Sequence, residues 1–145
     1  MAIYGAGSVW KKEEKENFFQ NKQYIIGWDY ETADDLYEAV SQLKVGDIIY
    51  LKSNQPGSRK LRIKGIGIVK TSFLQCFIKN NLKANEVKDW NSFFVDVEWV
   101  IKKEFSIEIP AENGRLTNVR AATFYPEYSP FVQQKILEEI FKRIK

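Results

Sequence analysis

The sequence contains no histidine and only one cysteine, Cys76, in 145 residues. Histidine is the commonest general base and metal ligand in proteins, and one cysteine can build neither a disulfide within the chain nor a thiolate zinc site. Cys76 lies in the apolar segment 73–78, where burial raises the pKa of a thiol and leaves it unreactive. We therefore expect a protein that is not an enzyme, needs no metal or cofactor, and works in a reducing, cytoplasmic compartment.

Long apolar runs and targeting signals are also missing. No apolar run approaches the length of about 18 residues that marks a transmembrane helix, and no charged-then-apolar segment opens the chain. Gly65 and Gly67 lack the further glycines of a phosphate-binding loop. Neither sign of charge dominates, because 22 basic and 19 acidic residues give a net charge of +3. That charge permits a nucleic-acid partner without requiring one.

What is present is the composition of one folded domain, residues 1–145, with 44% hydrophobic and 14% aromatic residues. Apolar alternation and helical spacing predict the elements. The predicted strands are 3–7, 23–28, 48–53, 61–69, 93–101 and 105–109. The predicted helices are 10–20, 33–43 and a last one after Ser129-Pro130, with a short strand and a long excursion expected in 73–89. The fold class is α+β: a mixed sheet of five or six strands, curled towards a barrel, with flanking helices and a C-terminal helix.

One predicted strand ends its apolar row on a polar side chain. In the segment 48–53, Ile49, Leu51 and Ser53 share one face, so Ser53 lies at the edge of the core, where a hydroxyl needs a partner. The earlier apolar strand ends on Trp28 and Asp29. A barrel mouth that offers an indole face beside a hydroxyl and a carboxylate suits a flat, hydrogen-bonding ligand such as a nucleobase.

The order of these elements resembles the PUA-like superfamily, and within it the EVE and YTH domains. The matching segments are Ile25-Ile-Gly-Trp28, the Gly-Asp turn and strand Asp47–Ser53 with Asn54, Gly65–Val69, and Val95–Trp99. The resemblance implies a PUA-like barrel that reads modified bases by turning the altered base out of its strand into an aromatic pocket. Such a domain acts alone or as the recognition part of a modification-dependent restriction or RNA-related system, with DNA or RNA as partner and an effector domain fused or associated.

The predicted base pocket has aromatic walls and a polar end. Trp28 is the predicted first wall, and its structural alternative is ordinary core packing. Trp10 is the predicted second wall, and its alternative is a packing role at the start of a helix. Asp29, Ser53 and Asn54 are the residues expected to read the base edge; alternatively they satisfy backbone groups of turns. Of the other two tryptophans, Trp90 is a candidate cap over the pocket, and Trp99 is predicted to lie in the core.

A reader must also hold the backbone of the strand, and basic residues near the predicted mouth suit that role. They are Lys11, Lys12, Lys52, Arg59, Lys60 and Arg62. The alternative for each is a solvated surface charge, so only their gathering on one face matters. Two other functions stay open: a sensor of a free nucleotide or similar small ligand, and a protein-interaction module that uses the aromatic side chains.

Overall fold

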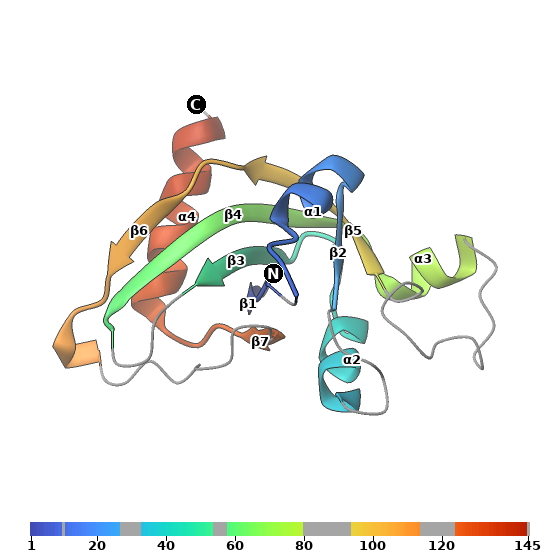
Figure 1. Ribbon diagram of the computed structural model, residues 1–145, viewed down its shortest axis with the longest axis horizontal. Helices are drawn as coiled ribbons and strands as arrows, with labels where there is room; N and C mark the ends of the chain where they lie inside the picture. The colour runs from blue at the N-terminus through green and yellow to red at the C-terminus, as the bar shows by residue number, and fades with distance from the viewer. Residues whose placement is uncertain (10, 27–32, 54–57, 80–93, 114–123, 145) are drawn as a thin grey trace.

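The computed structural model describes residues 1–9, 11–26, 33–53, 58–79, 94–113 and 124–144 (Figure 1). It shows an α+β domain with one curled, mixed sheet of seven strands. The strands are β1 (Ile3–Ala6), β2 (Gln23–Ile25), β3 (Ile48–Ser53), β4 (Lys60–Thr71), β5 (Phe94–Ile101), β6 (Phe105–Glu108) and β7 (Phe124–Pro126). The helices are α1 (Lys15–Asn21), α2 (Asp34–Ser41), α3 (Phe73–Lys79) and α4 (Pro130–Ile144), with a 3₁₀ turn at Ala111–Asn113.

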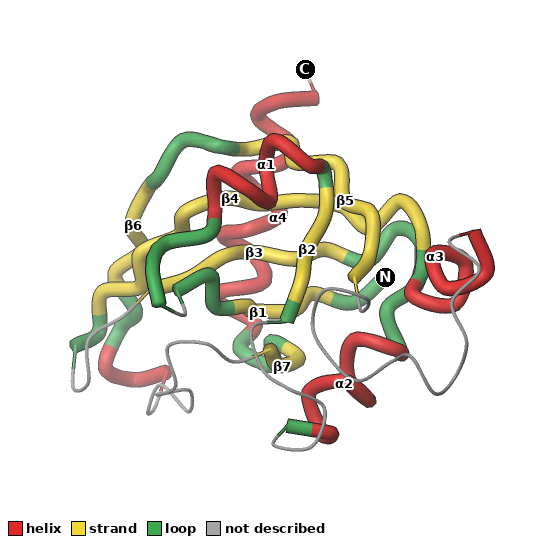
Figure 2. The backbone as a smooth tube through the Cα atoms, turned by 45° about the vertical axis from the view of Figure 1, so that its right-hand side comes forward, coloured by secondary structure: helices red, strands yellow, loops and turns green. Residues whose placement is uncertain are grey.

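The sheet curls into a half-barrel, as Figure 2 shows. Its strand order is β2-β5-β4-β3-β1-β7, and β6 pairs with the first half of β4. The pair β1–β3 is parallel and the other ladders are antiparallel. The two edge strands approach each other through their side chains, because the rings of Tyr24 on β2 and Phe124 on β7 lie 5.7 Å apart. The described edges of the sheet are thereby brought together around one interior.

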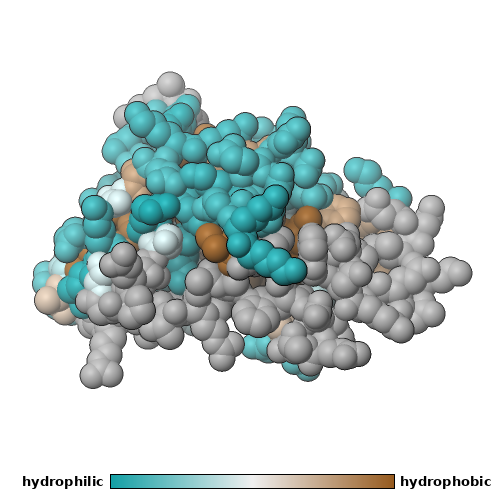
Figure 3. Space-filling model, viewed as in Figure 1, coloured by the Kyte–Doolittle hydropathy of each residue, from teal (hydrophilic) through white to brown (hydrophobic). Residues whose placement is uncertain are grey.

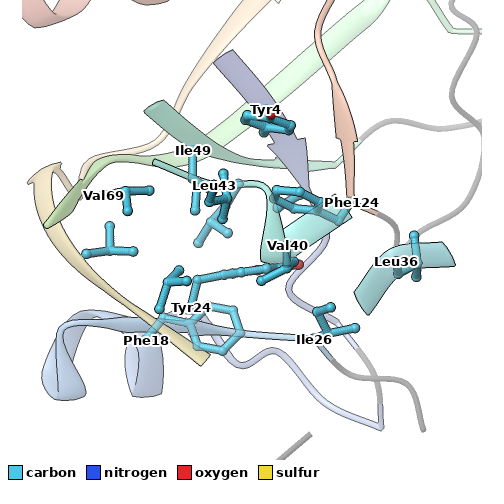
Figure 4. Close-up of a cluster of buried hydrophobic side chains, with 14 of the residues drawn as sticks. Tyr4, Phe18, Tyr24, Ile26, Leu36, Val40, Leu43, Ile49, Val69 and Phe124 are labelled. Atoms are coloured by element: carbon cyan, nitrogen blue, oxygen red, sulfur yellow. The ribbon is translucent and has the colours of Figure 1, made fainter. Parts of the chain in front are cut away.

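Each face of the sheet covers a hydrophobic cluster. The inner face packs against α1 and α2 and includes Ile49, Leu51 and the aromatic residues that Figure 4 shows. The outer face carries Ile48 and Tyr50 and packs against α4. Both rows of β3 are therefore buried, since α4 covers the face that a one-sided strand would expose to water.

Two close approaches explain the glycines of β4. A Cβ on Gly65 would meet the Phe19 ring at 2.7 Å, and one on Gly67 would meet Trp99 at 2.8 Å and would clash with Val97. The glycines thus make room for core aromatic residues on the inner face.

The alternating segments form strands as the sequence predicts. Strands lie across 48–53, 60–71 and 94–101 in one curved sheet. Ile49, Leu51, Val97 and Trp99 are all buried, which confirms the predicted core face. The last helix begins at Pro130, and the Ser129 hydroxyl accepts a hydrogen bond from the backbone N–H of Val132 at 3.4 Å. Cys76 is buried, and burial raises the pKa of its thiol.

Three sequence predictions are wrong in detail. Residues 73–79 form helix α3, not a strand, because Ser72 and Gln75 make a reciprocal capping box. The first helix begins at Lys15, not at residue 10, because an isolated bridge joins Val9 to Glu13. The sheet gains β7, whose three residues pair with β1. None of the described helices is long and apolar enough to span a membrane.

Candidate nucleic-acid interface

A β-bulge shapes the region where β3 ends and β4 begins. Leu51 pairs with Gly65 and Ser53 pairs with Arg62, so β4 has two residues where β3 has only Lys52. The extra residue is Lys64, and its side chain turns into the protein, where it is 1% exposed. Bulges of this kind redirect one side chain out of the regular alternation. Here the bulge brings an ammonium group to the connection between β1 and α1.

The Lys64 ammonium lies within a polar cluster of three side chains. Its Nζ is 2.7 Å from Glu13 Oε1 and donates a hydrogen bond to the Ser8 hydroxyl. Ser8, which is fully buried, in turn donates to Glu13 Oε2 at 2.5 Å. Partial burial raises the pKa of the Glu13 carboxyl, but the hydrogen bonds from Lys64, Ser8 and the Lys15 backbone, together with the charge of Lys64, outweigh it and lower that pKa. Glu13 is therefore held as a carboxylate.

This cluster closes the base of a short loop. Val9 and Glu13 form an isolated antiparallel bridge, and the Glu14 N–H donates to the Ser8 carbonyl at 2.8 Å. Lys11 and Lys12 lie exposed between the two ends. Because the ends are fixed to each other and to β4, the two lysines are presented from an ordered base.

Next to this loop, one carboxylate bridges two cations. Glu104, in the connection between β5 and β6, accepts from Lys15 Nζ at 2.6 Å. Its other oxygen lies 3.3 Å from Arg62 Nε. The hydrogen bond from Lys15 is the main reason that the pKa of Glu104 is lowered. Since Arg62 is the cross-strand partner of Ser53, this group lies at the end of the Ile49-Leu51-Ser53 row.

The structure separates the predicted backbone-binding residues into two groups. Lys11, Lys12, Lys60 and Arg62 are exposed. The Arg59 guanidinium is instead half-buried and donates to two backbone carbonyls, Ile109 O at 2.8 Å and Pro110 O at 2.6 Å. Arg59 therefore ties the start of β4 to the chain that follows β6.

Lys52 lies inside the protein, with 3% exposure. Its ammonium is 5.5 Å from the centre of the Tyr125 ring. The Tyr125 hydroxyl lies 3.0 Å from the Tyr50 hydroxyl, which also donates a hydrogen bond to Glu127. Burial lowers the pKa of Lys52 to about 8, against the attraction of Glu127. The phosphate contact predicted for Lys52 does not fit this placement, because a buried ammonium does not reach a strand at the surface.

The predicted aromatic walls lie outside the described residues, as do two of the edge-reading residues. This applies to Trp10, Trp28, Asp29 and Asn54, and to Trp90 as well. Ser53 is described and is half-buried at the end of β3. The predicted strands of Trp28 and Ser53 are not neighbours in the sheet, since β5 and β4 lie between β2 and β3. Their sharing of one cavity stays a prediction.

A described cavity of about 770 Å³ lies at the other end of the sheet. It is lined by the start of β1, the end of α2 and the start of α3, and includes Tyr4, Leu43 and Asp47. The two Asp47 oxygens accept from the backbone N–H groups of Ala2 at 2.9 Å and Lys44 at 2.8 Å. Within the described part of the chain, no group of three or more His, Cys, Asp or Glu side chains is placed to hold a metal ion.

The sequence analysis missed the residues that organise this candidate interface: Ser8, Glu13, Lys15, Lys64 and Glu104. One signal for Lys64 is present in the sequence. The apolar row of β4 falls on Leu61 and Ile63 and then on Ile66 and Ile68, so its phase changes across the bulge. Glu104 carries no comparable signal, because its partners are distant in sequence.

No family model matches the sequence, and no curated protein matches it. Among solved structures, a hypothetical protein from Leishmania major is similar with a TM-score of 0.54 and 14% identity, over 98% of this chain and 97% of that one. This likeness shows the fold alone. The YTH domain of the Zygosaccharomyces rouxii MRB1 protein, in complex with N6-methyladenosine RNA, gives a TM-score of 0.47 at 18% identity, covering 97% and 84% of the two chains. The Pho92 YTH domain in complex with m6A gives 0.46 at 17% identity, covering 97% and 86%.

Proposed function

We propose that this domain binds a single strand of nucleic acid, DNA or RNA, and holds a modified base of that strand in a pocket at the mouth of the half-barrel. The observation that carries the proposal is the end of β3. There the interior row passes from Ile49 and Leu51 to Ser53, and Ser53 pairs with the exposed Arg62. A polar group at the rim of an apolar interior, beside a cation, suits a base edge next to a phosphate.

The loop between Val9 and Glu13 supports the same function. It presents Lys11 and Lys12 at the surface, and Lys64 anchors its base to β4 close to Arg62. A nucleic-acid strand that places one base at Ser53 would therefore meet Arg62 beside that base and the two lysines of the loop further along. Each phosphate contact lowers log affinity by about 0.7 per unit of log salt for a single strand.

The walls of the pocket are assigned from the sequence alone, Trp28 with the support of the resemblance and Trp10 from its place after the glycine-rich segment 5–8. In the proposal, Trp28 and Trp10 stack on the base, and Asp29, Ser53 and Asn54 read its edge. Stacking on an aromatic side chain contributes about 1–3 kcal/mol per base, which is comparable to the few kcal/mol that turning a base out of a duplex costs. Edge contacts then discriminate, since a wrong base leaves buried polar groups unpaired. Such a domain suits a stand-alone reader or the recognition part of a modification-dependent restriction system.

The test is a panel of single-stranded RNA and DNA oligonucleotides, each with and without N6-methyladenine or 5-methylcytosine, at low and high salt. We expect one modified oligonucleotide to bind more tightly than its unmodified counterpart. Trp28→Ala should lose about 1–3 kcal/mol of that binding and keep the thermal unfolding transition. Equal affinity for every member of the panel would reject a base reader.

A sensor of a free nucleotide or similar small ligand is the second candidate, and two observations favour it. Several cations of the interface are already paired with acids: Lys64 with Glu13, and Lys15 and Arg62 with Glu104. The cavity beside Tyr4 also has a volume within the usual range for small ligands. A free modified nucleoside that binds as tightly as the oligonucleotide, with no response to salt, would establish the sensor.

A further inference from the structure

We propose, building on the nucleic-acid-binding function above, that Lys15 and Arg62 form a phosphate-binding subsite for which Glu104 is a built-in competitor. The Glu104 carboxylate lies where a backbone phosphate would bind, and an incoming strand displaces it.

The geometry of the group resembles recognition of a phosphate. One oxygen of Glu104 lies 2.6 Å from Lys15 Nζ, and the other lies 3.3 Å from Arg62 Nε. The Arg62 Nη2 approaches the first oxygen at 3.5 Å, so the guanidinium presents two nitrogens to one carboxylate. A phosphodiester offers the same two-oxygen edge and the same single negative charge, and the arginine fork accepts either group.

The Lys15, Arg62 and Glu104 side chains lie on the path that we expect a nucleic-acid strand to follow. Arg62 is the cross-strand partner of Ser53 at the end of the interior row. Lys15 begins α1, directly after the loop that presents Lys11 and Lys12. Figure 3 shows that hydrophilic residues cover the described surface around α1 and the adjoining strands. The subsite therefore joins the base-reading end of β3 to the lysines of the loop.

Glu104 is placed so that it can leave without disturbing the sheet. It lies in the connection 102–104 between β5 and β6, and its side chain is 35% exposed. Ion pairs at such exposure contribute little to stability, because water and salt screen them. The residues just before it, Lys102 and Lys103, are exposed as well, so the connection keeps a positive charge when Glu104 turns outward.

The consequence is a lower affinity for every nucleic-acid strand, whether or not it carries a base that fills the pocket. With Glu104 in place the three side chains carry a net charge of +1, and without its charge they carry +2. A strand must exchange with Glu104 to gain the phosphate contact, so the subsite contributes less than two unopposed cations would. The base pocket then supplies a larger share of the total binding free energy, while the ratio of affinities between two strands stays the same.

The test is Glu104→Gln, measured with an unmodified single-stranded RNA and with the same RNA carrying N6-methyladenosine. We expect the fall of log affinity with log salt to be steeper in the variant than in the wild type by about 0.7. The affinity of the variant relative to that of the wild type then rises about fivefold for each tenfold decrease in salt. Both oligonucleotides should gain alike. The matched control is Glu98→Gln, which removes the same charge from another exposed pair, Lys70–Glu98 at 3.6 Å.

A second variant links the gain to the subsite. Glu104→Gln combined with Arg62→Gln should lose the steeper slope, because the arginine fork that would hold the phosphate is gone. The proposal is overturned if Glu104→Gln and Glu98→Gln change the slope equally, since that is a general effect of net charge. It is also overturned if Glu104→Gln weakens binding or lowers the unfolding temperature by more than Glu98→Gln, because Glu104 would then be a structural clamp between α1 and β6.

The result is separable from the proposed function. Base preference is read from the ratio of the two affinities within one variant, and the subsite from the salt slopes between variants. No preference in any variant, with a steeper slope for Glu104→Gln, would reject the base reader and keep the subsite. A preference for the modified RNA with equal slopes in the two glutamine variants would do the reverse.

Discussion

Lys64 is a lysine whose ammonium group lies inside the protein, and its partners decide whether that is tolerated. Among the described residues its Nζ donates hydrogen bonds to Ser8 and Glu13. A buried charge that loses its countercharge retains the cost of leaving water, whereas an apolar replacement of similar size removes the charge itself.

Glu13→Gln should therefore lower the free energy of unfolding by about 1.5–3 kcal/mol. Lys64→Met should cost less, because it fills the same space without a charge and leaves Glu13, whose side chain is 33% exposed, free to meet water. Urea unfolding of both variants and of the double variant measures the difference. An equal cost for the two single variants would show that packing, not charge, dominates at this position.

Lys52 is the second buried lysine, and its lowered pKa makes the free energy of unfolding depend on pH. Burial lowers that pKa from 10.5 to about 8. Between these two values the unfolded chain binds the proton more often than the folded protein does, so the contribution of Lys52 to stability rises with pH. The free-energy cost of burying the charged ammonium is fully present below pH 8, and it is lost as the pH rises towards the pKa that Lys52 has in the unfolded chain.

We therefore expect the stability difference between the wild type and Lys52→Met to shift in favour of the wild type from about pH 8 to pH 10. Above that range the absolute stability of both proteins falls with pH, since burial raises the pKa values of Tyr50 and Tyr125 and the folded state keeps their protons. The comparison between the two proteins removes this shared effect. Urea unfolding at several pH values follows the difference. A difference that is constant over the range would contradict the lowered pKa.

Among the elements, β4 combines most of the features that define the fold. It pairs with β3, β5 and β6, carries the bulge at Lys64 and supplies the glycines that admit Phe19 and Trp99. Gly67→Ala should cost about 1–3 kcal/mol, because its Cβ would overlap Val97 and Trp99 in a packed core. Lys70→Ala, on the exposed end of the same strand, should change stability by less than about 0.5 kcal/mol. Urea unfolding tests both, and a neutral Gly67→Ala would show that Trp99 can move aside.

The elements that the sequence predicts correctly are those with a long periodic signal. Alternation over eight residues gives β5, and an apolar stripe after Ser129-Pro130 gives α4. Helix α3 was missed although Ser72 and Gln75 form a capping box, because the apolar residues beside Cys76 suggest a strand when periodicity alone is considered. Strand β7 has three residues and depends on pairing with β1, which is distant in sequence, so no local sequence pattern predicts it.

At the scale of the whole molecule, the candidate interface depends on contacts that no local sequence pattern contains. Glu104 is separated from Lys15 by 89 positions, and Lys64 from Ser8 by 56. The sequence could place Ser53 at the end of an inner row and bring Arg62 near it, since both follow from strand alternation and pairing. It could not foresee that acids neutralise part of the basic rim, because that follows from how α1, β4 and β6 meet.

The exposed lysines of the loop are therefore the cations best suited to test backbone binding. Arg59 is unsuitable because its guanidinium fixes Ile109 and Pro110, so its replacement would disturb the fold as well as the charge. Lys11→Gln with Lys12→Gln leaves the pinned base of the loop intact, since Ser8, Glu13 and Lys64 are unchanged.

If both lysines contact phosphates, the double variant should flatten the slope of log affinity against log salt by about 1.4 for a single strand, with base preference unchanged. The matched control is Lys142→Gln with Arg143→Gln near the end of α4, which removes the same formal charge from exposed positions on another element. Fluorescence anisotropy with one labelled oligonucleotide over a salt series measures both slopes. Equal flattening in the two double variants would mean that nucleic-acid binding depends only on the net charge of the domain. The loop would then not be part of the interface.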